Sequence, residues 1–80
     1  MEKTFVYAIR SKKRNYIYLG MTNNIIRRFA EHNSGNNKTT KPYSPFELLL
    51  TEEFSDRKAA RIREKYLKSG IGKEYIKARH

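Results

Sequence analysis

The sequence contains no cysteine, and it has no long apolar run. Without cysteine there is no disulfide bridge, no thiolate metal site and no cysteine nucleophile, so a bound metal would need oxygen or imidazole ligands. No stretch approaches the roughly 20 apolar residues of a membrane-spanning helix, and no signal-peptide core is present. We therefore expect a cytoplasmic protein that does not associate with membranes.

Acidic residues are also scarce. The 80 residues include 18 Lys and Arg against 8 Asp and Glu, which gives a formal net charge of +10. Such an excess predicts attraction to polyanions, with nucleic acid as the leading partner. Six Tyr and four Phe argue against a disordered basic chain. A chain of this length allows one modest core, so we expect a single domain over residues 1–80.

The first part of the chain predicts a β-hairpin. Thr4 to Arg10 and Tyr16 to Gly20 are rich in β-forming residues and are separated by a short polar segment. A turn centred between Lys12 and Lys13 would place Tyr7 directly opposite Tyr18. Both tyrosines then share one face of the sheet. The other face is expected to carry Val6, Ala8, Ile17 and Leu19.

A helix, a loop and a third strand are expected next. Asn23 or Asn24 can cap a helix that ends at Ser34-Gly35 and packs through an apolar stripe. We expect the stripe to comprise Ile25, Ile26, Phe29 and Ala30. Residues 34–46 are too polar and too rich in Gly and Pro for a regular element, which predicts a basic loop. Phe46 to Phe54 is interpreted as a strand, with a helix as the alternative for so short an apolar run.

The last third predicts two helices. Ser55 followed by Asp56 opens the first, and Gly70 ends it. Its expected inward stripe is Ala59, Ile62, Arg63, Tyr66 and Leu67, with Glu64 at the edge. Residues 73–80 are expected to form a short closing helix that docks through Ile71, Tyr75 and Ile76.

Several of these side chains suit phosphodiester cleavage. A tyrosine has a reference pKa of about 10, so Tyr7 or Tyr18 can act as a base only where positive charge favours the phenolate. Arg28 offers a planar fork of donors that matches phosphate oxygens. Glu64 could anchor Mg²⁺, which often needs only one or two protein carboxylates. His32, one helical turn after Arg28, could orient water or phosphate.

Each candidate also has a purely structural interpretation. The tyrosines could be a stabilising cross-strand pair, and Arg28 could be one more solvated basic residue. Glu64 could simply pair with Lys68 four residues later, and His32 could complement the end of a helix dipole. From the residues alone, the chain is a basic, mixed α/β nucleic-acid-binding module with a candidate site.

The same residues resemble the motifs of the GIY-YIG nuclease superfamily. Phe5-Val6-Tyr7 is similar to the first triplet, and Tyr18-Leu19-Gly20 is similar to the second. Gly20 to Asn33 resembles the segment that follows the second triplet, and Arg63 to Lys68 resembles the helix that carries the acidic residue. The resemblance extends from Phe5 to about Tyr75. It is nearest to the small stand-alone members related to the nuclease module of the bacterial excision-repair endonuclease.

This resemblance implies an α/β (α+β) fold with a three-stranded antiparallel sheet flanked by helices, in the order β-β-α-β-α with a short C-terminal helix. It implies that Tyr7 is the general base or water-activating phenol, and that Tyr18 is a second site tyrosine. Arg28 would stabilise the phosphate, and His32 would assist the nucleophile. Glu64 would hold a single Mg²⁺ or Mn²⁺ ion. Ala59-Ala60 departs from relatives that carry a supporting acid there.

The resulting hypothesis is a metal-dependent DNA endonuclease or nickase, with a role in DNA repair or recombination and no small-molecule cofactor. Basic residues expected to contact the nucleic acid are Arg27, Lys38, Lys41 and Lys68. Another protein could supply target specificity. Two alternatives stay open: a catalytically weak nucleic-acid-binding accessory module, and an RNA-directed basic protein.

Overall fold

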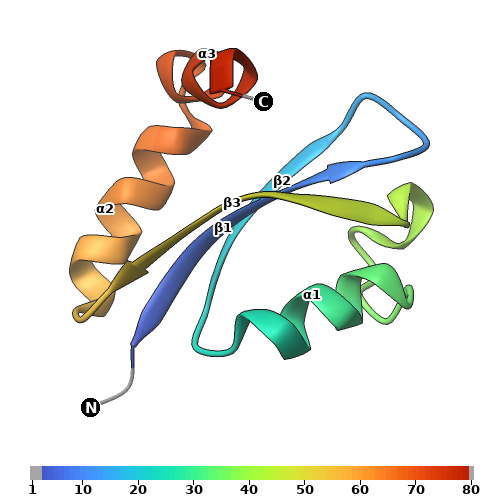
Figure 1. Cartoon of the computed structure of the whole chain (residues 1–80), viewed down its shortest axis with the longest axis horizontal. Helices are drawn as coiled ribbons and strands as arrows, with labels where there is room; N and C mark the ends of the chain where they lie inside the picture. Colours follow the sequence, from blue (N-terminus) through green and yellow to red (C-terminus); the bar gives the residue numbers. More distant parts are fainter. Residues whose placement is uncertain (1–2, 80) are drawn as a thin grey trace.

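The structure, a computed structural model, describes residues 3–79 and contains a three-stranded antiparallel sheet with three α-helices. The strands lie in the order β2-β1-β3, so β1 is central (Figure 1). The predicted fold class is therefore confirmed. The elements are β1 (Thr4–Ser11), β2 (Ile17–Thr22), α1 (Ile25–Asn33), a short 3₁₀ turn η1 (Lys41–Tyr43), β3 (Phe46–Phe54), α2 (Arg57–Lys68) and α3 (Gly70–Arg79).

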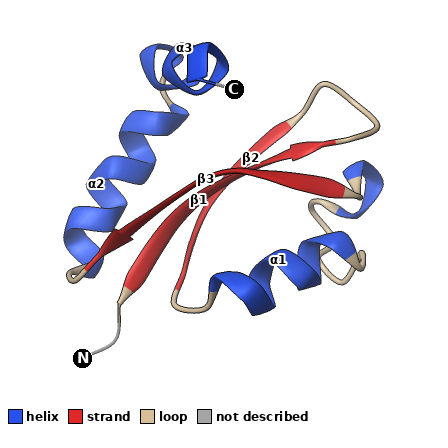
Figure 2. Ribbon diagram, in the orientation of Figure 1, coloured by secondary structure: helices blue, strands red, loops and turns tan. Residues whose placement is uncertain are grey.

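Helices cover both faces of the sheet, as predicted. Figure 2 shows α1 on one side of the strands, and α2 and α3 on the other. Because side chains alternate along a strand, β1 sends Tyr7 and Ile9 toward α1, and Val6 and Ala8 toward α2. The sheet therefore separates two small cores.

The hairpin register differs from the prediction by two residues. Tyr7 pairs with Gly20, and Ile9 pairs with Tyr18. The turn is longer than expected, with the backbone N–H of Ser11 donating to the carbonyl of Tyr16. A shift of two residues preserves the face to which each side chain points, so both tyrosines still lie on the α1 side.

Both main helices begin where the sequence predicted. The Asn24 side chain accepts a hydrogen bond from the backbone N–H of Arg27 and caps α1, while Asp56 caps α2 through the N–H of Lys58. After α1 the chain turns at Gly35, whose φ of 79° lies in the left-handed region that favours glycine.

The buried stripes of the two helices were predicted correctly only in part, since Phe29 and Leu67 face inward as expected but other predicted residues do not. Ile26 is 84% exposed and Ile62 is 64% exposed, so neither belongs to the core. The stripe of α1 consists of Ile25, Arg28, Phe29 and His32, and the stripe of α2 consists of Ala60, Arg63, Glu64 and Leu67. In both helices, polar residues three or four positions after an apolar one complete the inward face.

The end of the chain also differs in detail. α2 ends at Lys68, and α3 begins at Gly70 instead of Lys73. Ile76 is buried as predicted, whereas Ile71 is 72% exposed. Gly72 lies against the backbone of the last turn of α2, where a Cβ would collide with Leu67 Cα. The part of the predicted closing helix at His80 lies outside the described residues.

Within residues 3–79, no helix is long and apolar enough to cross a membrane. The cytoplasmic location expected from the sequence stays a prediction.

Candidate active site

Tyr7 and Tyr18 form the floor of the candidate site. Their ring centroids lie 6.2 Å apart on the face covered by α1. Tyr7 comes from the central strand and is almost fully buried, while Tyr18 comes from β2 and is partly exposed. The expected juxtaposition is therefore present, although as a diagonal pair across the strands.

Gly20 makes room for the Tyr7 ring. A Cβ at residue 20 would lie 2.7 Å from the Tyr7 hydroxyl oxygen and 3.0 Å from Cε2 of Tyr18. Because Gly20 is the cross-strand partner of Tyr7, the phenol lies directly over it. Residue 20 must therefore be glycine, because any side chain there would collide with the Tyr7 ring.

Helix α1 brings His32 to the Tyr7 hydroxyl. His32 Nε2 lies 2.9 Å from Tyr7 Oη, and its ring centroid lies 4.9 Å from that of Tyr18. The side chain of His32 is 0% exposed. His32 is therefore part of the buried site and not a cap of the helix terminus.

Thr40 completes a buried chain of hydrogen bonds that the sequence did not reveal. Its Oγ1 lies 2.8 Å from Nδ1 of His32, and both residues are fully buried. The side chain of Asn37 accepts from the backbone N–H groups of Thr39 and Thr40, which holds this part of the loop in place. The only sequence signal was Asn37 two and three residues before Thr39 and Thr40, in a segment expected to be a loop.

The surroundings of the hydrogen-bonded Tyr7 and His32 favour the uncharged forms of both side chains. Burial raises the pKa of Tyr7 above its ordinary value, and the neighbouring Arg28 guanidinium opposes this by lowering it. Burial lowers the pKa of His32, and Arg28 lowers it further. At neutral pH, Tyr7 is thus a phenol and His32 an uncharged imidazole with one donor and one acceptor nitrogen.

Arg28 lies on the inward stripe of α1, next to Tyr7. Its Nη1 donates to Oε1 of Glu31 over 2.9 Å, and this hydrogen bond is the main reason that the pKa of Arg28 is raised. The pair leaves about a third of each side chain accessible to solvent. Arg28 is therefore a permanent positive charge at the mouth of the site.

Glu64 approaches from the other side of the sheet. It lies on α2 on the same inward stripe as Ala60 and Leu67, and its side chain is 15% exposed. One carboxylate oxygen is 3.5 Å from Nζ of Lys68, so the expected i,i+4 pair is present. The structure brings Tyr7, Tyr18, Arg28 and His32 together and does not place Glu64 in contact with them.

The edge of β2 connects these two parts. A hollow of about 370 Å³ is lined by Tyr18 together with Lys68, the ion-pair partner of Glu64. The other lining residues are Ile17, Leu19 and Lys73. A substrate at this edge would therefore meet the tyrosine side and the carboxylate side of the site together.

An ion pair with β3 sets the rotation of α2. Arg63 donates to both carboxylate oxygens of Glu52 over 2.7 and 3.0 Å. Successive residues of a helix point about 100° apart, so anchoring Arg63 toward β3 turns Glu64 away from that strand. Arg63 faces inward, as predicted, and its ion pair with Glu52 makes it a positioning residue for α2.

The basic residues expected to contact nucleic acid are exposed to different degrees. Lys38 and Lys41 are exposed in the loop after α1, and Arg27 lies 4.0 Å from a carboxylate oxygen of Glu31. Lys68 is about half exposed beside Glu64. Their contact with DNA stays a prediction.

The donor set fits a hydrated divalent cation held by one protein carboxylate. Residues 3–79 contain no cluster of three or more His, Cys, Asp or Glu side chains that could chelate a metal. Both nitrogens of His32 already have hydrogen-bond partners. Mg²⁺ often keeps several waters and takes only one or two carboxylates along with substrate phosphates, so Glu64 alone satisfies the requirement.

Comparisons with known proteins show the family to which the chain is similar. The family model described as the GIY-YIG catalytic domain matches residues 3–75. A UPF0213 protein of Staphylococcus haemolyticus is 36% identical over 78 residues, which cover 96% of this chain and 94% of the relative. A UPF0213 protein of Clostridium perfringens is 35% identical over 65 residues, covering 80% and 69%. The solution NMR structure of a UPF0213 protein from Bacillus halodurans is similar with a TM-score of 0.58 and 30% identity, covering 95% of this chain and 83% of that chain.

Proposed function

Because the chain belongs to the GIY-YIG catalytic domain family, we propose that it is a Mg²⁺- or Mn²⁺-dependent DNA endonuclease or nickase. The observation that carries the proposal is the buried hydrogen-bonded chain of Tyr7, His32 and Thr40 beside Arg28. Residues 1–80 act as one nuclease domain in the cytoplasm, in DNA repair or recombination. A partner protein supplies target specificity.

Water activation is assigned to Tyr7 and His32. We assign the proton of the neutral imidazole to Nδ1, so that Nδ1–H donates to Thr40 Oγ1 and Nε2 accepts from the Tyr7 hydroxyl. As the Tyr7 oxygen takes a proton from the attacking water, Nε2 takes the phenolic proton. The buried hydroxyl of Thr40, the hydrogen-bond partner of Nδ1, is a positioning group that holds the His32 ring in this orientation.

Charge stabilisation is assigned to Arg28. As water oxygen forms its bond to phosphorus and the phosphodiester P–O bond on the opposite side breaks, negative charge is shared among the phosphate oxygens. The guanidinium can exchange its hydrogen bond to Glu31 for one to a phosphate oxygen. Tyr18, partly exposed beside His32, lines the position of the water.

Glu64 is assigned to metal binding. A bound divalent cation would act as a Lewis acid on the phosphate and stabilise the departing oxygen. Glu64 would hold the cation in place of its present partner Lys68, whose Nζ would then be free to contact the DNA backbone.

The proposal is tested by cleavage of supercoiled plasmid, branched DNA and single-stranded DNA with Mg²⁺ or Mn²⁺. We expect Tyr7→Phe, Arg28→Ala and Glu64→Ala each to lower the rate by at least about 10²-fold, while DNA binding is retained. Glu53→Gln is the matched control, since Glu53 pairs with Lys3 on the far edge of the sheet. A natural protein that binds DNA in a salt-dependent manner but leaves every DNA form uncut would support the accessory-module alternative instead.

A further inference from the structure

Three hollows follow one another along the free edge of β2. The first, of about 390 Å³, lies where β2 ends and is lined by Thr4, Thr22, Asn23 and Arg57. The second is the hollow between Tyr18 and Lys68 described above. The third, of about 310 Å³, lies where β2 begins and is lined by Asn15, Tyr16, Ile17, Lys73 and Lys77. The second and third hollows share Ile17 and Lys73 and are continuous, and the first lies at the opposite end of the strand. We call this row of hollows along β2 the trough.

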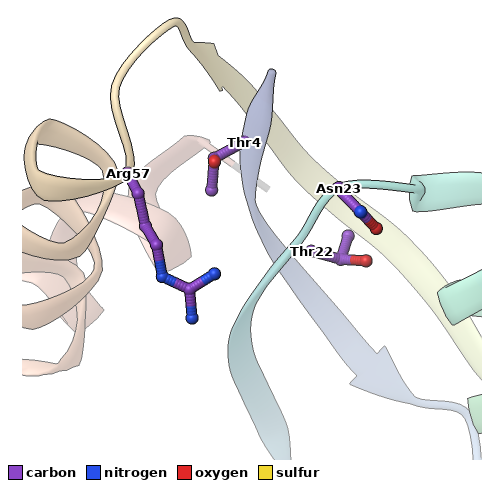
Figure 3. A pocket seen from close by; sticks show the side chains of 4 residues that line it. All are labelled: Thr4, Thr22, Asn23 and Arg57. Atoms are coloured by element: carbon purple, nitrogen blue, oxygen red, sulfur yellow. The ribbon is translucent and has the colours of Figure 1, made fainter. Parts of the chain in front are cut away.

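The first hollow presents a cation without an acidic neighbour in its lining. In Figure 3 the Arg57 side chain extends from the start of α2 beside Thr4, with Thr22 and Asn23 on the facing chain. Arg57 is exposed and makes no ion pair with another residue in the 3–79 range. Its guanidinium donors are therefore available to an anionic ligand.

The other end of the trough presents lysines from α3. Lys73 lines two of the hollows, and Lys77, one helical turn later, lines the third. Close packing of Gly72 on the last turn of α2 fixes α3 at this position. No carboxylate lines any of the three hollows.

The candidate site lies between the two cationic ends. α2 packs along β1 and β2, with Arg57 beside the end of β2 and Lys68 beside Tyr18 and Leu19. Glu64 lies one helical turn before Lys68, and thus between Arg57 and the α3 lysines. A strand of this length spans about 17–20 Å, so the two cationic ends can contact different phosphates of one DNA strand.

We infer that this trough binds one DNA strand on both sides of the phosphate that is cut. Arg57 contacts the backbone on one side, and Lys73 and Lys77 contact it on the other. Charge supports a polyanion over a second copy of the chain, because two copies that each carry +10 repel one another. The inference deepens the proposed function and rests on it only for the position of the cut.

The test is binding of a fluorescent single-stranded DNA oligonucleotide at several salt concentrations, without divalent ions. We expect the double variant Lys73→Gln with Lys77→Gln to weaken binding and to reduce the salt slope by about 1.4, or about 0.7 per lost phosphate contact. Arg57→Gln should reduce it by about half as much. The matched control is Lys58→Gln with Lys65→Gln, which removes two exposed charges from α2 that line none of these three hollows.

A reduction confined to the trough variants supports the inference. Equal salt slopes for the trough variants and the control would overturn it. The DNA would then be attracted by the overall positive charge and not by these particular residues. Binding without divalent ions separates this result from the proposed function. If the trough variants reduce the slope but the protein cuts no DNA, the trough inference stands and the nuclease proposal fails. If the protein cuts DNA but the slopes are unchanged, the nuclease proposal stands and the trough inference fails.

Discussion

The two faces of the sheet bury different kinds of side chain. The face toward α2 and α3 packs an apolar cluster of Val6, Ala8, Leu19, Leu49, Ala60, Leu67 and Ile76. The face toward α1 also buries Ile9 and Phe46, but it contains the hydrogen-bonded side chains of Tyr7 and His32, and we call it the polar face. Apolar burial stabilises a fold without fixing the direction of any group, whereas buried hydrogen bonds fix direction and are costly when incomplete.

The comparison shows how a small chain separates stability from chemistry. Along β1 the side chains alternate, so Val6 and Ala8 belong to the apolar face while Tyr7 belongs to the polar one. Among residues 3–79, no buried side-chain N or O atom lacks a hydrogen-bond partner. The polar face is therefore satisfied in its resting state and can hold Tyr7 and His32 in fixed orientations.

The largest effect is expected from a cavity in the apolar face. Leu67 is 0% exposed, so Leu67→Ala should lower the free energy of unfolding by about 2–5 kcal/mol. Ile62→Ala, on the exposed side of the same helix, is the control and should change it by less than about 0.5 kcal/mol. Urea denaturation measures both. Similar values for the two variants would mean that the α2 face does not form the main stabilising core.

A substitution on the polar face should lower stability less but should lower cleavage activity strongly. Gly20→Ala places a methyl group against the Tyr7 hydroxyl and should cost about 1–3 kcal/mol of stability. It should also abolish most of the proposed cleavage, because Tyr7 is displaced from His32. Thr51→Ala alters the partner of Tyr7 on the opposite strand, at an exposed position, and is the control. Retained cleavage by Gly20→Ala would show that the orientation of Tyr7 is unimportant.

The smallest effect is the pH dependence that the polar face alone should show. The pKa of His32 is lowered in the folded protein, whereas in the unfolded chain it has its ordinary value of about 6.5. Below about pH 6.5 the unfolded chain therefore binds more protons than the folded protein. The contribution of neutral His32 to stability is thus complete above about pH 6.5 and decreases as the pH falls. The slope should reach at most about 1.4 kcal/mol per pH unit. His32→Gln should flatten the dependence of the unfolding free energy on pH between pH 5 and 7 relative to the natural protein. Equal slopes for the two proteins would mean that folding does not change the pKa of His32.

Much of the fold could be predicted from local signals. The caps at Asn24 and Asp56 mark helix starts because their side chains bond to nearby backbone N–H groups, which involves only neighbouring residues. The facing of Tyr7 and Tyr18 also followed from the period of two along a strand, even though the register was wrong by two residues.

The buried helix stripes could not be read from hydrophobicity. Ile26 and Ile62 are more apolar than His32 and Glu64, yet the latter pair lies on the inward faces. The helices are rotated by contacts with distant elements, namely Tyr7 with His32 and Glu52 with Arg63. Such pairings join residues far apart in the chain, and no local pattern encodes them.

The sequence by itself determined the charge, the order of strands and helices, and the identity of the motif residues, because these depend on composition and short-range spacing. Tertiary structure alone decided that Thr40 meets His32, that burial holds Tyr7 as a phenol, and that Arg57 and the α3 lysines line one strand edge. The physical reason is that burial and hydrogen-bond partners are properties of the packed chain, and packing brings together residues that the sequence keeps apart.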